Sequence, residues 1–362
     1  MWKKGVVVVV VLLAVLAVLV GLFLHFEDRI VRRIVFQQAL ASIQAENLER
    51  MGNGLHVVLC GSGSPLPDPT RAGPCALVIA GEQVLMVDVG SGSMRNLGPM
   101  GIPPGRVDAL LLTHFHSDHI DGIGELMLQR WAGGSHTTPL PVIAPAGVTP
   151  IVEGFQQAYR TDIGYRIAHH GEVVVPPSGA GASARPFVLP PAEGRVVLQQ
   201  DGLTVTAFPV DHAPVEPSVG YRFDYQGRSA LISGDTKASE VVRRHAQGVD
   251  LLVHEALASD LVAILTEAAE AAGEAELATI TRDILDYHTS PVEAARIAAQ
   301  AEVGHLLYTH IVPQLPVALL ERQFLKGVDA VFDGPVTVGE DGLWVSLPAK
   351  STAIRVEQLL RW

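Results

Sequence analysis

The chain begins with a long apolar run, which an amphipathic segment follows. Gly5 to Leu24 contains no charged residue, and a helix of that length rising 1.5 Å per residue spans roughly 30 Å, the thickness of a bilayer core. From His25 to Met51, apolar residues recur among charged ones at helical spacing. The pattern predicts a transmembrane anchor at 1–24 and an amphipathic helical stalk at 25–53, suited to packing on the membrane or on a second subunit of a homodimer.

A cleaved signal peptide is the alternative reading of the apolar run. Signal peptides usually have shorter apolar regions, and the nearest small-x-small cleavage site, Ala39 to Ala41, lies well beyond this run and behind two arginines. The positive charges on the two sides of the apolar run favour opposite orientations in the membrane. Lys3 and Lys4 favour export of the folded body, and they are opposed by Arg29, Arg32 and Arg33. We expect a single-pass membrane protein with its body on the periplasmic or extracellular side.

Short apolar runs of strand length dominate the chain beyond Asn53-Gly54. Strands are predicted at 56–60, 76–80, 83–88, 109–113, 142–144, 203–210, 219–225, 229–233, 250–254 and 305–309. Helices are predicted at 120–131, 147–159, 256–285 and 291–300. Gly171 to Gly194 is rich in Gly, Pro, Ala and Ser, which is typical of a solvated loop. Many strands with helices between them indicate an α/β layered fold, with 54–362 as one domain.

Composition supports a folded body and bears on its partners. Of 362 residues, 48% are hydrophobic and 18% are charged, which is typical of a chain that buries a sizeable core. The formal net charge is −12. Because nucleic-acid binding draws much of its affinity from Lys and Arg neutralising phosphates, this balance disfavours nucleic acid as a partner.

The two cysteines leave two readings open. Cys60 ends one predicted strand and Cys75 begins the next. A disulfide between them would close a loop of about fifteen residues and contribute roughly 3 kcal/mol in an oxidising compartment. Buried free thiols are the alternative. Neither cysteine has the C-x-x-C spacing of a zinc or redox site.

The strongest chemical signal follows the predicted strand at 109–113. Three histidines and a carboxylate occupy six positions there: His114, His116, Asp118 and His119. In extended chain, residues i and i+2 project on the same side, so His114 and His116 can hold one ion. Where the chain then turns into a helix, Asp118 and His119 swing towards a second position. Imidazole and carboxylate are the ligands that zinc and similar cations prefer.

Four residues cannot complete two coordination shells, so further ligands must come from elsewhere. Three candidates each follow an apolar strand: His212, Asp235 and His310. Strand ends commonly place ligands at one edge of a sheet in α/β folds. The sequence therefore predicts a dinuclear metal centre built from seven side chains.

The spacing H-x-H-x-D-H, a later His, then S-G-D-T and T-H, resembles the metallo-β-lactamase superfamily of dinuclear zinc hydrolases. Within it, the chain is most similar to the branch of tRNase Z enzymes, cyclic-nucleotide phosphodiesterases and zinc-dependent arylsulfatases. This branch is indicated by Gly61-Ser62-Gly63-Ser64, His254-Glu255-Ala256 and His288-Thr289-Ser290. The resemblance covers about residues 54 to 320. It implies a four-layer αβ/βα metallo-β-lactamase sandwich, to which the apolar run adds an N-terminal transmembrane helix.

The resemblance also implies how the site residues divide. His114, His116 and His212 would hold the first ion, Asp118, His119 and His310 the second, and Asp235 would bridge both. The ions would be Zn²⁺, with Mn²⁺ or iron as alternatives, and a water shared between them would lose a proton near neutral pH and attack the substrate. Asp118, His288 and Glu255 are the candidate catalytic residues.

His288 and Glu255 have different expected roles. His288 would donate a proton to the leaving oxygen or stabilise the developing charge; the alternative is a plain neighbour of the N-cap of the helix at Pro291. Glu255, with His254, sits at a strand end and would orient a ligand from outside the metal shell.

The segment between His212 and Asp235 bears on the class of substrate. The spacing from His212 to Asp235 is only 23 residues. A tight hairpin predicted at 219–233 takes up most of this interval, in which tRNase Z enzymes carry a tRNA-gripping arm. The predicted helical stretch 256–285 is also acidic. We expect a small phosphodiester or sulfate ester as substrate. The alternatives are a tRNase Z-like ribonuclease, a lactonase or β-lactamase on the same metal core, and a site that binds metal without turnover.

Overall fold

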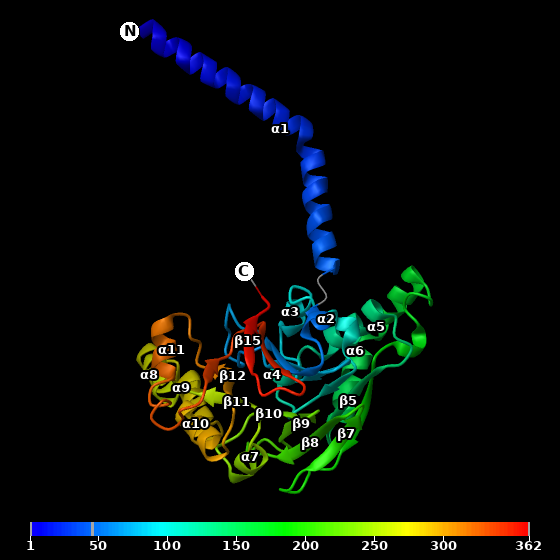
Figure 1. The fold of residues 1–362 in the computed structure, drawn as a ribbon, viewed down its shortest axis with the longest axis vertical. Coiled ribbons are helices and arrows are strands. Elements are labelled where there is room, and N and C mark those ends of the chain that lie inside the picture. Colours follow the sequence, from blue (N-terminus) through cyan, green and yellow to red (C-terminus); the bar gives the residue numbers. More distant parts are fainter. Residues whose placement is uncertain (1, 45–46, 361–362) are drawn as a thin grey trace. The chain divides into compact units, whose positions relative to one another are not determined.

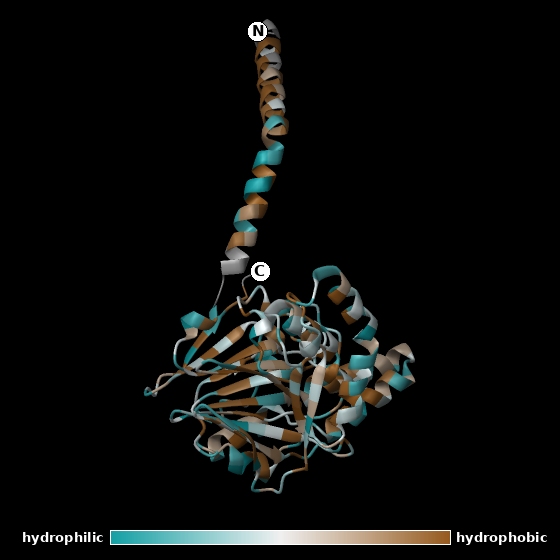
Figure 2. Ribbon diagram, turned by 90° about the vertical axis from the view of Figure 1, so that its right-hand side faces the viewer, coloured by the Kyte–Doolittle hydropathy of each residue, from teal (hydrophilic) through white to brown (hydrophobic). Residues whose placement is uncertain are grey.

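The N-terminal part of the chain is one long helix. The computed structural model describes residues 2–44 and 47–360, which belong to two compact units, 1–46 and 47–362. The first unit is α1 (Trp2–Gln44), and within it Gly5–Leu40 is long and apolar enough to cross a membrane, as judged by length and composition. Figure 2 shows mostly apolar colour over the first half of α1 and alternating colour over the second. The predicted anchor and the predicted stalk are therefore parts of one helix, which is continuous through residue 24.

The predicted stalk ends earlier than expected. A separate short helix, α2 (Asn47–Met51), belongs to the second unit. The Asn47 side chain donates to the Met100 carbonyl over 2.7 Å, and Met51 is buried. The predicted boundary at residue 53 is therefore wrong, because the buried face of α2 packs on the body. Residues 45 and 46, within the predicted stalk, lie outside the described residues.

The second unit contains two sheets. One has the strand order β15-β14-β1-β2-β3-β4-β5-β6, with bounds β1 Gly54–Gly61, β2 Cys75–Ala80, β3 Gln83–Val87, β4 Ala109–Leu111, β5 Leu140–Pro145, β6 Ala182–Phe187, β14 Leu343–Pro348 and β15 Arg355–Gln358. The other has the order β13-β12-β11-β10-β9-β8-β7, with bounds β7 Arg195–Gln200, β8 Leu203–Pro209, β9 Val219–Tyr225, β10 Arg228–Ile232, β11 Leu251–Leu257, β12 Leu306–Val312 and β13 Val336–Val338.

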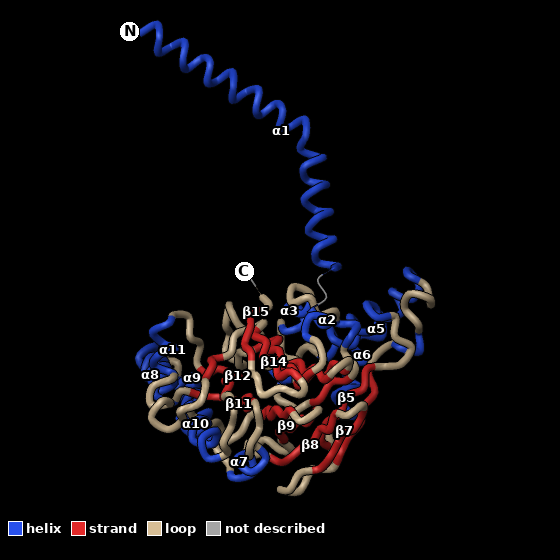
Figure 3. Tube along the Cα trace, viewed as in Figure 1, coloured by secondary structure: helices blue, strands red, loops and turns tan. Residues whose placement is uncertain are grey.

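Helices cover the outer faces of both sheets (Figures 1 and 3). Those between β3 and β6 are α3 Ser93–Leu97, η1 Pro104–Arg106, α4 Ser117–Ile120, α5 Ile123–Gly134, α6 Val148–His170 and η2 Pro177–Gly179. Those after β10 are α7 Glu240–His245, α8 Ser259–Ala272, α9 Ala275–Asp283, η3 Ile284–Asp286, α10 Pro291–Gln300 and α11 Ala318–Phe324. The layers follow the order helix, sheet, sheet, helix, as the family resemblance implies.

The alternating direction of apolar side chains along each strand explains why four layers form. In β1, Leu55, Val57 and Leu59 join the apolar core between the sheets, whereas Val58 and Cys60 face the core under α3, α5 and α6. Because successive side chains project to opposite faces, a strand that is apolar on both faces must be covered on both. All eight β1 residues are buried.

Several segments differ from the sequence-based expectation. Gly171 to Gly194 is not a plain loop, because β6 within it pairs in parallel with β5 and forms an edge of the sheet. The helical stretch predicted at 256–285 is a helix pair, because β11 runs on to Leu257 and Gly273, at φ +78°, ends α8. The strands β7 and β13 to β15 were not expected. The runs of β7, β13 and β15 are short or exposed and carry little periodic signal, whereas β14 is apolar and buried.

Cys60 and Cys75 form a disulfide, which resolves the two open readings. It joins the end of β1 to the start of β2, and Cys75 borders a cavity of about 30 Å³ that His119 and Asp235 also line. The cross-link therefore fixes the loop 61–74 at both ends beside the metal-ligand candidates.

Candidate metal centre

The segment after β4 forms one wall of the site. The N–H and hydroxyl of Thr113 donate to the two carboxylate oxygens of Asp88, each over 2.8 Å, and the chain leaves the sheet there. Because the Thr113 hydroxyl already donates its proton, it accepts from Nδ1–H of His114 at 3.0 Å. Nε2 of His114 is thereby left unprotonated, 3.0 Å from Nδ1 of His116. Two imidazole nitrogens thus converge on one point.

Asp88 also orients His119, a role that was not predicted. Its Oδ2 accepts from Nδ1 of His119 over 2.8 Å, so Nε2 of His119 faces the site. Asp88 has φ +56°, in the left-handed region that Asp adopts more readily than most residues. The sequence held one signal for this role: Asp88 directly follows the buried strand β3. The other candidate ligands also follow strands, so this position could have pointed to the site.

His212 follows β8 and is held by a backbone group. Its Nδ1 lies 3.0 Å from the Tyr287 carbonyl, which can only accept, so Nδ1 carries the proton. Nε2 of His212 is buried and has no hydrogen-bond partner among the described residues. The tautomer therefore directs a free lone pair towards the site.

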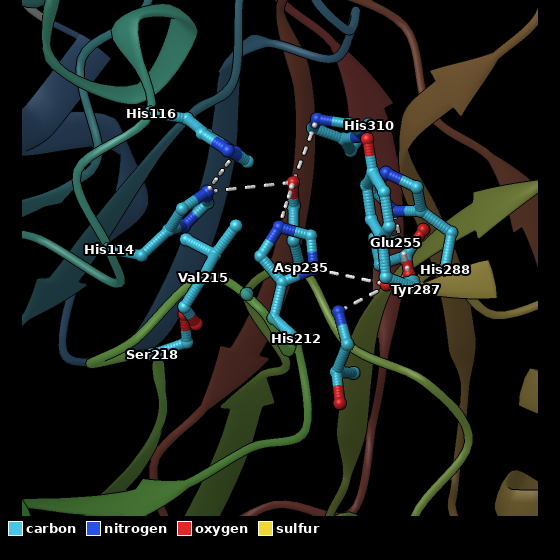
Figure 4. A network of polar contacts seen from close by, with 12 residues as sticks. His114, His116, His212, Val215, Ser218, Asp235, Glu255, Tyr287, His288 and His310 are labelled. Atoms are coloured by element: carbon cyan, nitrogen blue, oxygen red, sulfur yellow. Dashed lines mark hydrogen bonds and ion pairs between the residues drawn. The ribbon is translucent and has the colours of Figure 1, made fainter. Parts of the chain in front are cut away.

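Asp235 lies between the two groups of ligand candidates. It follows β10 through Gly234, at φ +62°, where an added Cβ would lie 2.8 Å from the Val219 carbonyl. One oxygen of Asp235, Oδ2, lies 3.8 and 3.9 Å from Nε2 of His114 and His212. The same oxygen lies 3.3 and 3.2 Å from Nε2 of His119 and His310. A single atom thus faces both groups, as Figure 4 shows for His114 and His310.

A bulge in β12 turns His310 into the site. Glu255 of β11 pairs with Thr309 and Ala256 pairs with Ile311, so His310 has no partner in the ladder. Its φ is +48°, an uncommon value for a residue other than glycine that the surrounding structure must hold in place. Nε2 of His310 lies 3.3 Å from Oδ2 of Asp118.

All seven predicted metal ligands therefore meet in one pocket. Potential ligand atoms lie within 4.8 Å of one another in each of two groups: His114, His116, His212 and Asp235; and Asp118, His119 and His310. The residues fit two cations, because Nε2 of His119 and of His212 are buried nitrogens with no hydrogen-bond partner in the described part of the chain. The set also combines imidazole with carboxylate.

The charge balance of the site favours bound cations. Burial lowers the pKa of His114, His116 and His212 and keeps these rings neutral, with lone pairs available. Burial also opposes protonation of His119, but Asp235 and other nearby carboxylates outweigh it and hold its pKa well above the ordinary value. Negative charge is thus concentrated where the second group of ligands lies.

His288 and Glu255 form a pair beside the metal ligands. Nδ1 of His288 lies 3.3 Å from Oε1 of Glu255, and both side chains are buried. Burial lowers the pKa of His288, but the Glu255 carboxylate outweighs it and raises this pKa to about 9. The Thr289 N–H donates to the same Glu255 oxygen over 2.9 Å. Glu255 therefore contacts His288, and its expected role of orienting a ligand stays a prediction that depends on whether His288 binds metal.

A ring nitrogen of His288 also lies within 4.8 Å of ligand atoms of Asp235 and His310, so geometry alone permits His288 to be a ligand. Ser290, two residues on, caps α10 through a capping box with Glu293. His288 is thus separate from the cap itself. Of the other histidines, His254 is buried with Nδ1 bonded to the Glu255 carbonyl, and His169 and His170 are exposed at the end of α6.

Comparison with known proteins supports the assignment that the geometry suggests. Residues 86–311 match the family model described as beta-lactamase superfamily domain. A protein named ribonuclease Z from Mycobacterium avium (strain 104) is 39% identical over 299 residues, which cover 82% of this chain and 100% of the relative. A protein of the same name from Mycobacterium tuberculosis (strain H37Rv) is 36% identical over 289 residues, covering 79% and 96%.

Two solved structures share the fold at low sequence identity. The metallo-β-lactamase fold protein YhfI from Bacillus subtilis matches with a TM-score of 0.57 at 20% identity, over 81% of this chain and 99% of that one. The short form of human tRNase Z matches with a TM-score of 0.55 at 22% identity, over the same shares. Taken together with the family model and the mycobacterial relatives, these likenesses lead to one conclusion: the chain belongs to the metallo-β-lactamase superfamily of metal-dependent hydrolases.

Proposed function

We propose that this protein hydrolyses phosphodiesters at a dinuclear metal centre, with RNA as its first candidate substrate. The convergence of seven histidine and aspartate side chains on one pocket supports the chemistry. Relatives named ribonuclease Z, up to 39% identical and matched over nearly their whole length, support the substrate. The name of these relatives conflicts with the expectation, drawn from the net charge, the short interval between His212 and Asp235 and the acidic stretch 256–285, that nucleic acid is disfavoured.

The ligands divide between two positions. His114, His116 and His212 would hold one divalent ion, Asp118, His119 and His310 the other, and Asp235 would contact both. Bound ions would polarise the phosphoryl group and lower the pKa of the attacking water. Zn²⁺ suits this mixture of imidazole and carboxylate, and Mn²⁺ or iron would also accept it.

The chain's own residues then move two protons. Asp118, whose side chain is 12% exposed, accepts a proton from the attacking water. His288 gives a proton to the leaving oxygen while Glu255 holds its ring. One P–O bond forms to the water oxygen as the P–O bond to the leaving alcohol breaks, so the products are a phosphomonoester and an alcohol.

A small phosphodiester or sulfate ester is the second candidate substrate, and one observation favours it. Between His212 and Asp235, β9 and β10 join through Gln226-Gly227 as a tight antiparallel hairpin. The interval that holds the RNA-binding arm in tRNase Z enzymes is therefore too short for an arm here. The acidic side chains of α8 and α9 would also repel a phosphate backbone.

A substrate panel with Zn²⁺- and Mn²⁺-loaded protein tests the proposal. The panel consists of a precursor tRNA with a 3′ extension, bis(p-nitrophenyl) phosphate, p-nitrophenyl sulfate and nitrocefin. We expect turnover of the two phosphodiesters, faster at saturating substrate for the RNA. Cleavage of bis(p-nitrophenyl) phosphate without cleavage of the tRNA would select the small-ester candidate. Turnover of nitrocefin or the sulfate alone would overturn phosphodiester hydrolysis.

We further propose that α1 is a single-pass membrane anchor and that the body lies on the exported side. The exposed apolar surface of α1 and the Cys60–Cys75 disulfide support this placement. On intact spheroplasts, added protease should degrade the body, and its two thiols should react with a maleimide only after reduction. A body that is protected from the protease and has reactive thiols would place it in the cytoplasm. That result would favour RNA over the small ester as the substrate.

A further inference from the structure

Tyr287 lies at the metal centre, and no role has been assigned to it so far. It follows η3, and its carbonyl accepts the hydrogen bond from Nδ1 of His212 over 3.0 Å. The main chain of Tyr287 is thereby fixed to a metal-ligand candidate. The position of the Tyr287 side chain is therefore fixed relative to the metal-ligand candidates.

Two histidines fix the direction of the Tyr287 ring. Its centroid lies 5.1 Å from that of His212 at an interplanar angle of 77°, an edge-on contact. The His288 ring lies 4.9 Å away at 46°. The ring is therefore held between a ligand of the first ion and the proposed proton donor, and Figure 4 shows the side chain extending along the site in the direction of His310.

The free group of Tyr287 is its hydroxyl. The side chain is partly exposed, and among the described residues no hydrogen bond joins its hydroxyl to another group, whereas Tyr221 and Tyr308, which are buried, each donate to a carbonyl over 2.6 Å. A phenol keeps its proton at neutral pH and so can donate to an anionic oxygen. The hydroxyl at the metal centre is available to a bound molecule.

We propose that the Tyr287 hydroxyl is a catalytic group that donates a hydrogen bond to a non-bridging oxygen of the phosphoryl group under attack. This inference rests on the proposed phosphodiesterase function and adds a donor that the ligand set and His288 do not supply. A fixed donor directed at a developing negative charge stabilises the transition state without reorganising. No change in the ligand set is needed, because Tyr287 contacts His212 through its carbonyl and its ring, and the hydroxyl takes no part in either contact.

Tyr287→Phe removes the hydroxyl alone and is the test variant, with Tyr165→Phe, on the exposed surface of α6, as the matched control. With bis(p-nitrophenyl) phosphate, kcat of Tyr287→Phe should fall about 10²-fold with little change in KM, at unaltered metal content. The control should match the wild type. Wild-type kcat in Tyr287→Phe would overturn the inference while leaving the proposed function intact.

A binding measurement separates this inference from the proposed function. Orthophosphate affinity of the Zn²⁺-loaded proteins, measured by calorimetry, should weaken about tenfold in Tyr287→Phe, because a hydrogen bond to a charged oxygen is lost. This readout does not require turnover. A wild type that cleaves no phosphodiester would refute the proposed function, and equal phosphate affinity of wild type and Tyr287→Phe would refute the donor role. Loss of metal in Tyr287→Phe would also overturn it and show a structural role.

Discussion

Replacing Asp235 with alanine should abolish activity and release metal. One oxygen of this buried carboxylate faces four histidine nitrogens at 3.2 to 3.9 Å, so neither ion keeps a full shell without it. Burial raises the pKa of Asp235, but His310 and His119 outweigh it and hold the pKa well below the ordinary value, which keeps the carboxylate charged. We expect turnover of bis(p-nitrophenyl) phosphate to fall at least about 10³-fold.

Metal content per chain, measured by plasma mass spectrometry, should fall in parallel with activity. Asp235→Asn keeps the shape of the side chain, so a loss of metal in both variants would exclude misfolding as the cause. Glu267→Ala, an exposed carboxylate on α8, is the control and should keep full metal and full rate. Two ions retained in Asp235→Ala at wild-type turnover would contradict the bridging position.

His288→Ala should slow the reaction and leave the metal in place. The expected loss is about 10²- to 10⁴-fold, the usual range for a positioned acid or base. It should be largest for a dinucleotide, whose leaving alkoxide needs a proton, and small for bis(p-nitrophenyl) phosphate, whose leaving group is stable as an anion. The measurement is kcat/KM on both substrates, together with metal content.

The controls for this variant are Glu255→Gln and His169→Ala. Glu255→Gln should show the same dependence on the leaving group with a smaller loss, because Glu255 acts only through His288. His169 is exposed at the end of α6, so its replacement should have no effect. If His288→Ala instead loses an ion, His288 is a ligand, as its distance from Asp235 and His310 permits.

Local patterns explain why most of the site could be predicted from the sequence. His114 to His119 carry four ligands in six positions, and His212, Asp235 and His310 each follow an apolar run of strand length in the sequence. Strand ends in an α/β fold meet at an edge, so ligands separated by 93, 23 and 75 positions along the chain could be placed together. The α10 start at Pro291 was also correct, because a capping box marks it.

The residues that were missed owe their roles to tertiary contacts. Asp88 looks in the sequence like the end of a strand, and only the fold places it 2.8 Å from His119. Tyr287 follows an acidic helix pair with no pattern that points to the metal centre. The edge strands β6 and β15 have exposed or mixed side chains, so hydrophobic alternation was too weak to reveal them.

Anomalous X-ray scattering at the zinc absorption edge, from crystals grown with Zn²⁺, tests the dinuclear centre most directly. We predict two peaks in each chain: one among His114, His116 and His212, the other among Asp118, His119 and His310, with Asp235 in contact with both. A single peak at saturating Zn²⁺, or side chains of His212 or His310 turned out of the pocket, would contradict the account.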